Sequence, residues 1–321
     1  MKGRGWYDVE GGETPSPPST ADIKAYTALF SPLCSPQSAL KSFTSNARKS
    51  SIRASVAAHL TSKRYIHPSY AHLLNLPKSS KSSFSSIPQN PYLDFWTWTC
   101  HHLSWCGPLP LPRSVSPPRI KSHPILPILM HHFGCAVPTH EALTILSLLC
   151  GPSQKIADIG SGSGYWTFLL RQYLSSRSPS QAVLGIDNAQ SLWRTTWIAD
   201  TVITPGTTFL SSLPNHKDII LLMVYPIVGG AMGAGGTEGQ FTRDLVAAYN
   251  GDVIAVVGTQ NHNGYTSFRD MTVDEFMERE HGDQWERIVQ VPLPSFAGKD
   301  EALFVFRRRD HQGVEKGESG N

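Results

Sequence analysis

Seven consecutive residues near the middle of the chain have the types and spacing of a ligand-binding turn. The segment DIGSGSG, residues 158–164, follows a short apolar run and precedes a helical pattern that begins at Tyr165. Glycine has no Cβ, so such a turn can adopt left-handed dihedral angles and let a ligand approach the backbone. The helix that follows presents free N–H groups at its start. The pattern therefore predicts a small-molecule site where the strand ends.

The spacing of these glycines differs from that of dinucleotide-binding proteins. Their fingerprint is G-x-G-x-x-G, and counting from Gly160 and Gly162 puts Tyr165 where the third glycine should be. The pattern here is D-x-G-x-G-x-G. An NAD(P)-dependent oxidoreductase is therefore a less favoured alternative.

Residues 158–164 resemble the first motif of class I S-adenosylmethionine (SAM)-dependent methyltransferases. A second apolar run, residues 182–187, ends in an aspartate where that family keeps an acidic residue for the ribose hydroxyls, and a carboxylate can accept both hydrogen bonds. The resemblance covers residues 138–309 and implies SAM as the cofactor, with the first aspartate of the motif toward its amino-acid end. The implied cofactor-binding residues are Asp158, Gly160, Ser161, Gly162, Ser163, Gly164, Asp187 and Asn188.

The region around the motif alternates apolar runs with helical patterns. Parallel strands buried on both faces are apolar throughout, and the alternation predicts an α/β fold with a doubly wound, mostly parallel sheet. Residues 207–210, TTFL, are expected to form its third strand. The expected strands are 155–160, 182–187, 207–210, 218–226 and 252–259, and the expected helices are 139–149, 165–174, 241–249 and 272–282.

The chain closes with two apolar runs, residues 285–294 and 301–309. The connection between them is too short for a helical crossover, so they are expected to form an antiparallel hairpin. They complete a seven-stranded sheet, for which the resemblance implies the order 3-2-1-4-5-7-6. Thr139 is a candidate helix N-cap, and Thr272 with Glu275 has the capping-box spacing.

Methyl transfer needs groups that position the nucleophile and, where necessary, remove its proton. Open α/β sheets bind ligands at the carboxyl ends of their strands. Tyr225 and His262 follow such ends and are the candidate catalytic residues, since an imidazole titrates near neutral pH. Glu141, Pro226 and Asn261 are candidate substrate residues. Each residue also has a non-catalytic interpretation. Tyr225 could be a packed aromatic side chain, His262 a histidine of a surface loop, and Glu141 an acidic residue that stabilises the first turn of its helix through the helix dipole.

Three further features bear on metal binding, on a possible lid and on adenine recognition. The Cys and His side chains between residues 100 and 135 match no strong zinc spacing and have apolar neighbours, so no metal is expected. The glycine-rich run 229–236 is either a mobile lid or a flexible connection. No acidic residue follows the expected third strand, which leaves adenine recognition to Ser211, Ser212 or backbone groups.

Composition divides the 321 residues into unlike parts. Residues 1–127 contain 14 Lys and Arg against 5 Asp and Glu, while the rest contains 14 against 20. We expect a disordered leader at 1–20, a helical and Pro/Ser-rich extension at 21–137 that packs on the core, the SAM-binding domain at 138–309, and a flexible tail at 310–321. Helical spacing in the extension is clearest at 21–30 and 51–60.

The sequence therefore predicts a SAM-dependent methyltransferase whose methyl acceptor is a small molecule, a protein or RNA. A non-catalytic SAM-binding or scaffold protein is the main alternative. No apolar run of signal-peptide or membrane-helix length occurs, and the five cysteines are oddly spaced. We expect reduced thiols and a cytoplasmic protein without membrane partners, and a nuclear location is compatible as well.

Overall fold

The computed structural model describes residues 18–74, 87–102, 107–108, 125–174, 182–188, 194–229, 237–296 and 299–309. The expected tail, most of the expected leader, Cys106 and residues 230–236 of the glycine-rich run lie outside the described residues. Helix α1 begins at Thr20, and the Ser19 side chain caps it by accepting a hydrogen bond from the Asp22 N–H at 3.1 Å. Residues 18–20 of the expected leader thus belong to the folded part.

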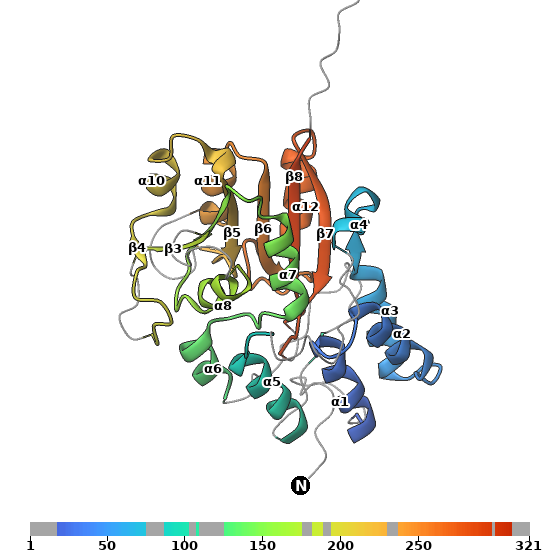
Figure 1. Cartoon of the computed structure of the whole chain (residues 1–321). Coiled ribbons are helices and arrows are strands. Elements are labelled where there is room, and N and C mark those ends of the chain that lie inside the picture. The colour runs from blue at the N-terminus through green and yellow to red at the C-terminus, as the bar shows by residue number, and fades with distance from the viewer. Residues whose placement is uncertain are drawn as a thin grey trace, which may run out of the picture.

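The core is an eight-stranded sheet with the order β1-β7-β8-β6-β5-β2-β3-β4 (Figure 1). Neighbours among β2 to β6 pair in parallel, and β8 runs antiparallel to β6 and β7. Without β1 this is the expected order 3-2-1-4-5-7-6 with its terminal hairpin, so the predicted fold class is confirmed. The strands are β1 (Tyr65–Ile66), β2 (Lys155–Ile159), β3 (Val183–Asp187), β4 (Val202–Ile203), β5 (Ile219–Val224), β6 (Val253–Thr259), β7 (Trp285–Pro292) and β8 (Glu301–Arg308).

Helices cover both faces of this sheet, as its apolar strands require. One face carries α7 (His140–Leu149) and α8 (Tyr165–Tyr173), in front of the sheet in Figure 1. The other carries α10 (Gly206–Ser211), α11 (Gln240–Ala248) and α12 (Val273–His281). Both predicted caps are present: the Thr139 hydroxyl accepts from the Ala142 N–H at 3.1 Å, and the Thr272 N–H donates to Glu275 at 3.0 Å.

The prediction of a strand at residues 207–210 is wrong. These residues lie in helix α10, and the third strand of the parallel series is β4, which pairs with β3 through Ile186 and Asp187. Short apolar runs do not distinguish strand from helix. Pro205 precedes the helix with a φ of −59°, which suits a helix start, and it is Phe209 and Leu210 that the helix buries.

The N-terminal extension gathers at one edge of the sheet. In Figure 1 the arrowhead of β7 points toward this edge, and β7 runs the same way as the parallel strands. Most of the extension therefore lies at the carboxyl ends of the strands, while residues 65–74 lie alongside β7 at the lateral edge of the sheet. Helices were predicted at 21–30 and 51–60 and are confirmed. Its elements are α1 (Thr20–Thr27), η1 (Ala28–Phe30), α2 (Pro36–Ser45), α3 (Ile52–Lys63), η2 (Pro68–Tyr70), α4 (Ala71–Leu74), α5 (Pro91–His102) and α6 (Leu126–Phe133).

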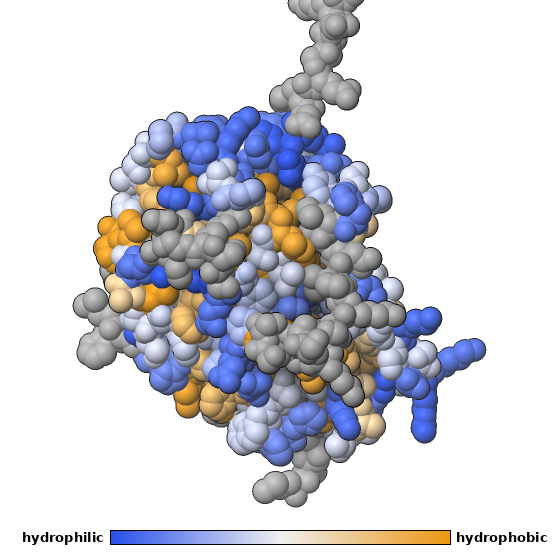
Figure 2. Space-filling model, viewed as in Figure 1, coloured by the Kyte–Doolittle hydropathy of each residue, from blue (hydrophilic) through white to orange (hydrophobic). Residues whose placement is uncertain are grey.

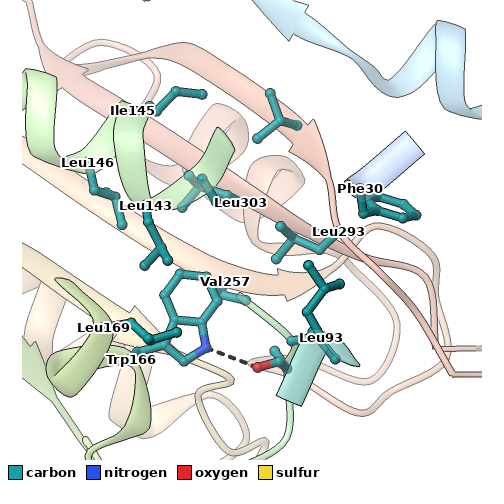
Figure 3. Packing of buried hydrophobic residues seen from close by; sticks show 14 of the residues in the cluster. Phe30, Leu93, Leu143, Ile145, Leu146, Trp166, Leu169, Val257, Leu293 and Leu303 are labelled. Carbon is teal, nitrogen blue, oxygen red and sulfur yellow. Dashed lines mark hydrogen bonds between the residues drawn. The ribbon is translucent and has the colours of Figure 1, made fainter. Parts of the chain in front are cut away.

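The extension shares the hydrophobic core with the sheet. Figure 3 shows Phe30 and Leu93 near Leu293, which follows β7, and Leu303 of β8 belongs to the same cluster. Trp96 of α5 is fully buried, and burying a large side chain of this kind contributes about 2 to 3 kcal/mol. The extension is thus an integral layer of the fold.

On the outside, apolar residues gather at the open edge of the sheet. Figure 2 shows a hydrophobic group at the place of β4, whose Ile203 is 63% exposed. Within the described part of the chain, no helix has both the length and the apolar character needed to cross a membrane.

Candidate functional site

The glycine turn between β2 and α8 is held in a left-handed conformation. Gly160, Gly162 and Gly164 have φ values of 79°, 57° and 74°, which side chains with a Cβ rarely adopt. The carbonyl of Ile186 in β3 accepts hydrogen bonds from the N–H groups of Gly160 and Ser161, at 2.8 and 3.0 Å. The turn is therefore fixed against the neighbouring parallel strand.

The segment 194–198 lies directly on this turn. A Cβ on Gly162 would come within 2.7 Å of the Arg194 guanidinium, and one on Gly164 within 2.5 Å of Ile198. The Trp197 N–H also donates to the Ser163 carbonyl at 2.8 Å. At Gly164 the close contact with Ile198 thus adds to the constraint of the dihedral angle, whereas at Gly162 the end of the flexible Arg194 side chain could move away.

Asp187 ends β3 and binds the turn through its side chain. Its carboxylate accepts a hydrogen bond from the Gly162 N–H at 2.9 Å. The next residue, Asn188, is exposed. The structure therefore brings together the expected ribose-binding carboxylate and the expected glycine motif.

Asp158, on β2, has no exposed surface. Its Oδ2 accepts a hydrogen bond from the Thr167 hydroxyl at 2.7 Å, and its Oδ1 has no hydrogen-bond partner among the described residues. Burial raises its pKa to about 7, a shift that Thr167 opposes and Asp187 reinforces. The buried Ser161 hydroxyl also has no partner in the described part of the chain. The turn thus adjoins two polar groups with unused hydrogen-bonding capacity.

A second polar cluster lies where β5 ends and β8 begins. Lys299 is its centre: its ammonium lies 4.4 Å from the centroid of the Tyr225 ring, 3.1 Å from Glu301 Oε1, and donates to the Cys135 carbonyl at 2.9 Å. The side chains of Lys299 and Glu301 are only 6% and 1% exposed. An ion pair is therefore buried behind the predicted catalytic residue Tyr225, which is itself partly exposed.

The environment shifts the acid–base properties of this cluster. Burial opposes a charge on Lys299, yet its neighbours, with Tyr225 and Glu301 foremost, raise its pKa above the usual lysine value. Burial also raises the pKa of Glu301, while Lys299 opposes that shift. The pKa of the Tyr225 phenol is raised by burial too. The ammonium stays charged, and the phenol stays protonated near neutral pH.

His262 has a different partner. Its Nε2 lies 2.8 Å from Glu275 Oε2, and the same carboxylate oxygen caps α12 through the Thr272 N–H. Asn261, beside it, is half-buried, and the Pro226 carbonyl accepts from the Ser267 N–H at 2.9 Å. The structure therefore places His262 against α12, while Tyr225 contacts Lys299.

Glu141 is paired with the extension. The Arg64 guanidinium donates to both of its carboxylate oxygens, and both side chains are mostly buried. Glu141 and His140 line a surface pocket with residues of the segment 29–36. The observed partner of Glu141 is thus an arginine, at the first turn of α7.

Helix α3 makes two more polar contacts at the carboxyl edge. His59 lies 2.8 Å from Asp300, which also accepts from the Gln260 amide at 2.9 Å, and Lys63 donates to the Gln260 carbonyl at 3.2 Å. One helix of the extension is therefore anchored beside the polar cluster by charged and amide groups.

Other expected features are tested only in part. Ser211 and Ser212, the serines considered for adenine recognition, donate hydrogen bonds from their hydroxyls to the Thr207 and Phe209 carbonyls at α10.

Among the described residues, no group of three or more His, Cys, Asp or Glu side chains is arranged to hold a metal ion.

The sheet order and the glycine turn together decide the fold. The core has the class I methyltransferase fold. No protein-family model and no curated protein matches the sequence.

Solved structures of methyltransferases are similar to this chain at low identity. They include magnesium protoporphyrin IX methyltransferase from Synechocystis PCC 6803 with bound SAM, at 10% identity and a TM-score of 0.33, over 52% of this chain and 74% of that one. A second is 1,6-didemethyltoxoflavin-N1-methyltransferase from Burkholderia thailandensis, at 16% and 0.35, over 53% and 78%. A third is an rRNA methylase from Streptococcus thermophilus, at 11% and 0.33, over 53% and 96%. All three TM-scores are below 0.5, so the assignment of the methyltransferase fold rests on the strand order.

Sequence reasoning missed Lys299 and Glu301. Both fall at the junction between a hairpin connection and an apolar strand, and the connection was read only as a turn. A signal was present: Lys-Asp-Glu directly precedes the run ALFVF, and Glu301 begins a strand whose first six residues are all buried. Charged residues that enter a buried strand need a partner.

Proposed function

We propose that this protein is a SAM-dependent methyltransferase. The observation that carries the proposal is the left-handed glycine turn at the carboxyl end of β2, with the Asp187 carboxylate bound to its Gly162 N–H. This edge is where open α/β sheets bind ligands. The fold and the turn agree, and neither alone would be specific.

The residues around the turn fit such a cofactor. Asp187 has carboxylate oxygens for the ribose hydroxyls, with the exposed Asn188 beside it, and the turn from Gly160 through Ser161, Gly162 and Ser163 to Gly164 would lie along the ligand. Asp158 is fully buried, so it would act through Thr167 and the turn. When bound, SAM supplies a methyl group on a positively charged sulfur.

The acceptor would bind at the ends of β5 and β6. Tyr225, partly exposed and backed by Lys299, would contact it, with Pro226 and Asn261 beside it. His262 would take part only after leaving Glu275, so we place it at the rim of the site. Glu141 would act on the acceptor indirectly, because Arg64 occupies both of its oxygens. Small molecules, proteins and RNA remain the acceptor classes.

Binding of three adenosine-containing ligands to the full-length protein tests the proposal. Calorimetric titration with SAM, S-adenosylhomocysteine and NADH should show binding of the first two. Asp187→Ala should weaken SAM binding at least tenfold, while Asp200→Ala, at a half-exposed aspartate paired with Arg171, should leave it unchanged. Binding of NADH in preference to SAM would refute the proposal. SAM binding without methyl transfer to any extract fraction would support a non-catalytic SAM-binding protein instead.

A further inference from the structure

The buried Lys299–Glu301 pair has features that a purely structural ion pair does not need. Burying an ion pair removes two charges from water and is rarely favourable compared with apolar packing. The Arg64–Glu141 pair holds the extension to α7, but Lys299 and Glu301 lie only two residues apart, at the start of β8, so their pairing joins no distant parts of the chain. Stability therefore gives no evident reason for the pair.

Glu301 retains capacity to accept hydrogen bonds. Its Oε1 lies 3.1 Å from the Lys299 ammonium, and Lys299 and Ser295 both oppose the rise of its pKa. Neither carboxylate oxygen has a well-aligned hydrogen bond among the described residues. A carboxylate can accept about four hydrogen bonds. A buried carboxylate with few donors is suited to accept an N–H or O–H group, and then its proton.

Backbone strain is concentrated at the same place. Four non-glycine residues in the described part of the chain have positive φ: Ser50, Tyr225, Ser267 and Asp300. Tyr225 follows β5 and Asp300 precedes β8, while the Ser267 N–H donates to the Pro226 carbonyl beside Tyr225. Tyr225 has φ 56° and Asp300 φ 53°. Such conformations cost of order 1 to 3 kcal/mol each and cluster at functional sites.

A short segment links this cluster to the glycine turn. Lys299 donates to the Cys135 carbonyl, while the Ser163 hydroxyl of the turn donates to the Phe133 carbonyl at 3.2 Å. Between them, the Gly134 carbonyl accepts from the Tyr92 hydroxyl at 2.9 Å. The ion pair and the turn thus border the same three residues, 133–135.

We infer that Glu301, positioned by Lys299 behind Tyr225, accepts the proton that the methyl acceptor loses. This inference rests on the proposed function. The sulfur–methyl bond breaks with its electron pair left on sulfur, the acceptor nitrogen or oxygen forms the new bond to the methyl group, and its proton passes to the carboxylate. The sulfonium charge disappears as Glu301 is neutralised beside Lys299, so the total charge of the site is conserved. The raised pKa of Glu301 brings it closer to neutral pH, as suits a general base.

Methyl transfer from radiolabelled SAM to separated small-molecule, RNA and protein fractions of cell extract tests this role. Glu301→Gln should lower the labelling rate in the active fraction at least a hundredfold and leave the SAM dissociation constant within twofold. Glu301→Asp should restore part of the rate. In the wild type the rate should rise with pH through one ionisation, and in Glu301→Gln this rise should be lost.

A double variant and an infrared measurement separate a catalytic role of Glu301 from a structural one. Because Glu301→Gln leaves a buried lysine unpaired, the double variant K299M/E301Q removes both charges and should show the same loss. Infrared difference spectra of Asp158→Asn between pH 5 and 9, which lack the carboxyl band of Asp158, should contain a carboxyl band that the further change Glu301→Gln abolishes. If SAM fails to bind the wild type, the proposed function fails. If SAM binds and labelling is unchanged in a folded Glu301→Gln, the methyltransferase stands and the role of Glu301 is refuted.

Discussion

Replacing Asp158 by asparagine should make the protein more stable at neutral and alkaline pH. The carboxyl group is fully buried and its pKa is about 7, against 3.8 in the unfolded chain. The folded state therefore holds the proton more tightly than the unfolded state. Stability that is fully present below pH 3.8 is lost progressively as the pH rises toward 7.

The size of this loss follows from the same values. Each pH unit between 3.8 and about 7 corresponds to about 1.4 kcal/mol, so the charged carboxylate costs the folded state up to about 4 kcal/mol at pH 8. An asparagine at this position has no charge to bury, and its amide oxygen can accept from the Thr167 hydroxyl as the carboxylate does. We expect Asp158→Asn to raise the free energy of unfolding by about 2 to 4 kcal/mol at pH 8 and to have no effect at pH 3.5.

Urea unfolding followed by tryptophan fluorescence, at intervals between pH 3.5 and 8, measures the difference between variant and wild type. Asp200→Asn is the matched control, because hydrogen bonds from Arg171 lower the pKa of Asp200, and its difference should have the opposite sign. If the stability curves of the wild type and Asp158→Asn run parallel across this range, the assigned burial of the charge is wrong. SAM titration of the same variant shows whether the carboxylate is kept for function at a cost in stability.

Three further perturbations have defined outcomes. Gly164→Val should lower the free energy of unfolding by about 2 to 4 kcal/mol in urea titrations, because φ is 74° and the new Cβ would meet Ile198 at 2.5 Å; an unchanged midpoint would contradict the described turn. Arg64→Ala should lower the free energy of unfolding by about 3 to 5 kcal/mol, because it leaves Glu141 buried and unpaired. The folded variant should keep its affinity for SAM. A loss below about 1 kcal/mol would mean that water already reaches the pair. Deleting residues 1–17 should leave the melting temperature within about 2 °C in calorimetry, because the cap of α1 remains; a larger fall would show that these residues pack on the fold.

Much of the sheet could be predicted because its strands are apolar on both faces. Runs such as DIILLMV and DVIAVVGT have few other structural solutions, and the short connection before Glu301 required a hairpin. The prediction of the third strand failed because β4 has only two residues, too few to show a hydrophobic pattern in the sequence. The first strand of the extension, β1, was missed for the same reason.

Some contacts of the candidate site could be predicted from the sequence, and others could not. The glycine turn is local in sequence, and the resemblance to class I methyltransferases implied that Asp187, at the end of the next strand, lies beside it. Lys299 and Cys135 are distant in the sequence, as are His59 and Asp300, and only the folded sheet brings them together. Glu141 was read from its position in a helix, whereas its partner Arg64 belongs to a different layer.

The pairing of β1 with β7 imposes an order on the assembly of the molecule. Tyr65 lies opposite Gln290, 225 residues further along the chain, so β1 leaves the ribosome long before its partner strand. Contacts between residues so distant in sequence slow folding. A domain generally folds as a unit, so the extension can complete its packing only after β7 has been synthesised. A product truncated before β7 would therefore carry an extension without its docking strand, with the face of α3 that packs on β7 exposed to proteases and chaperones.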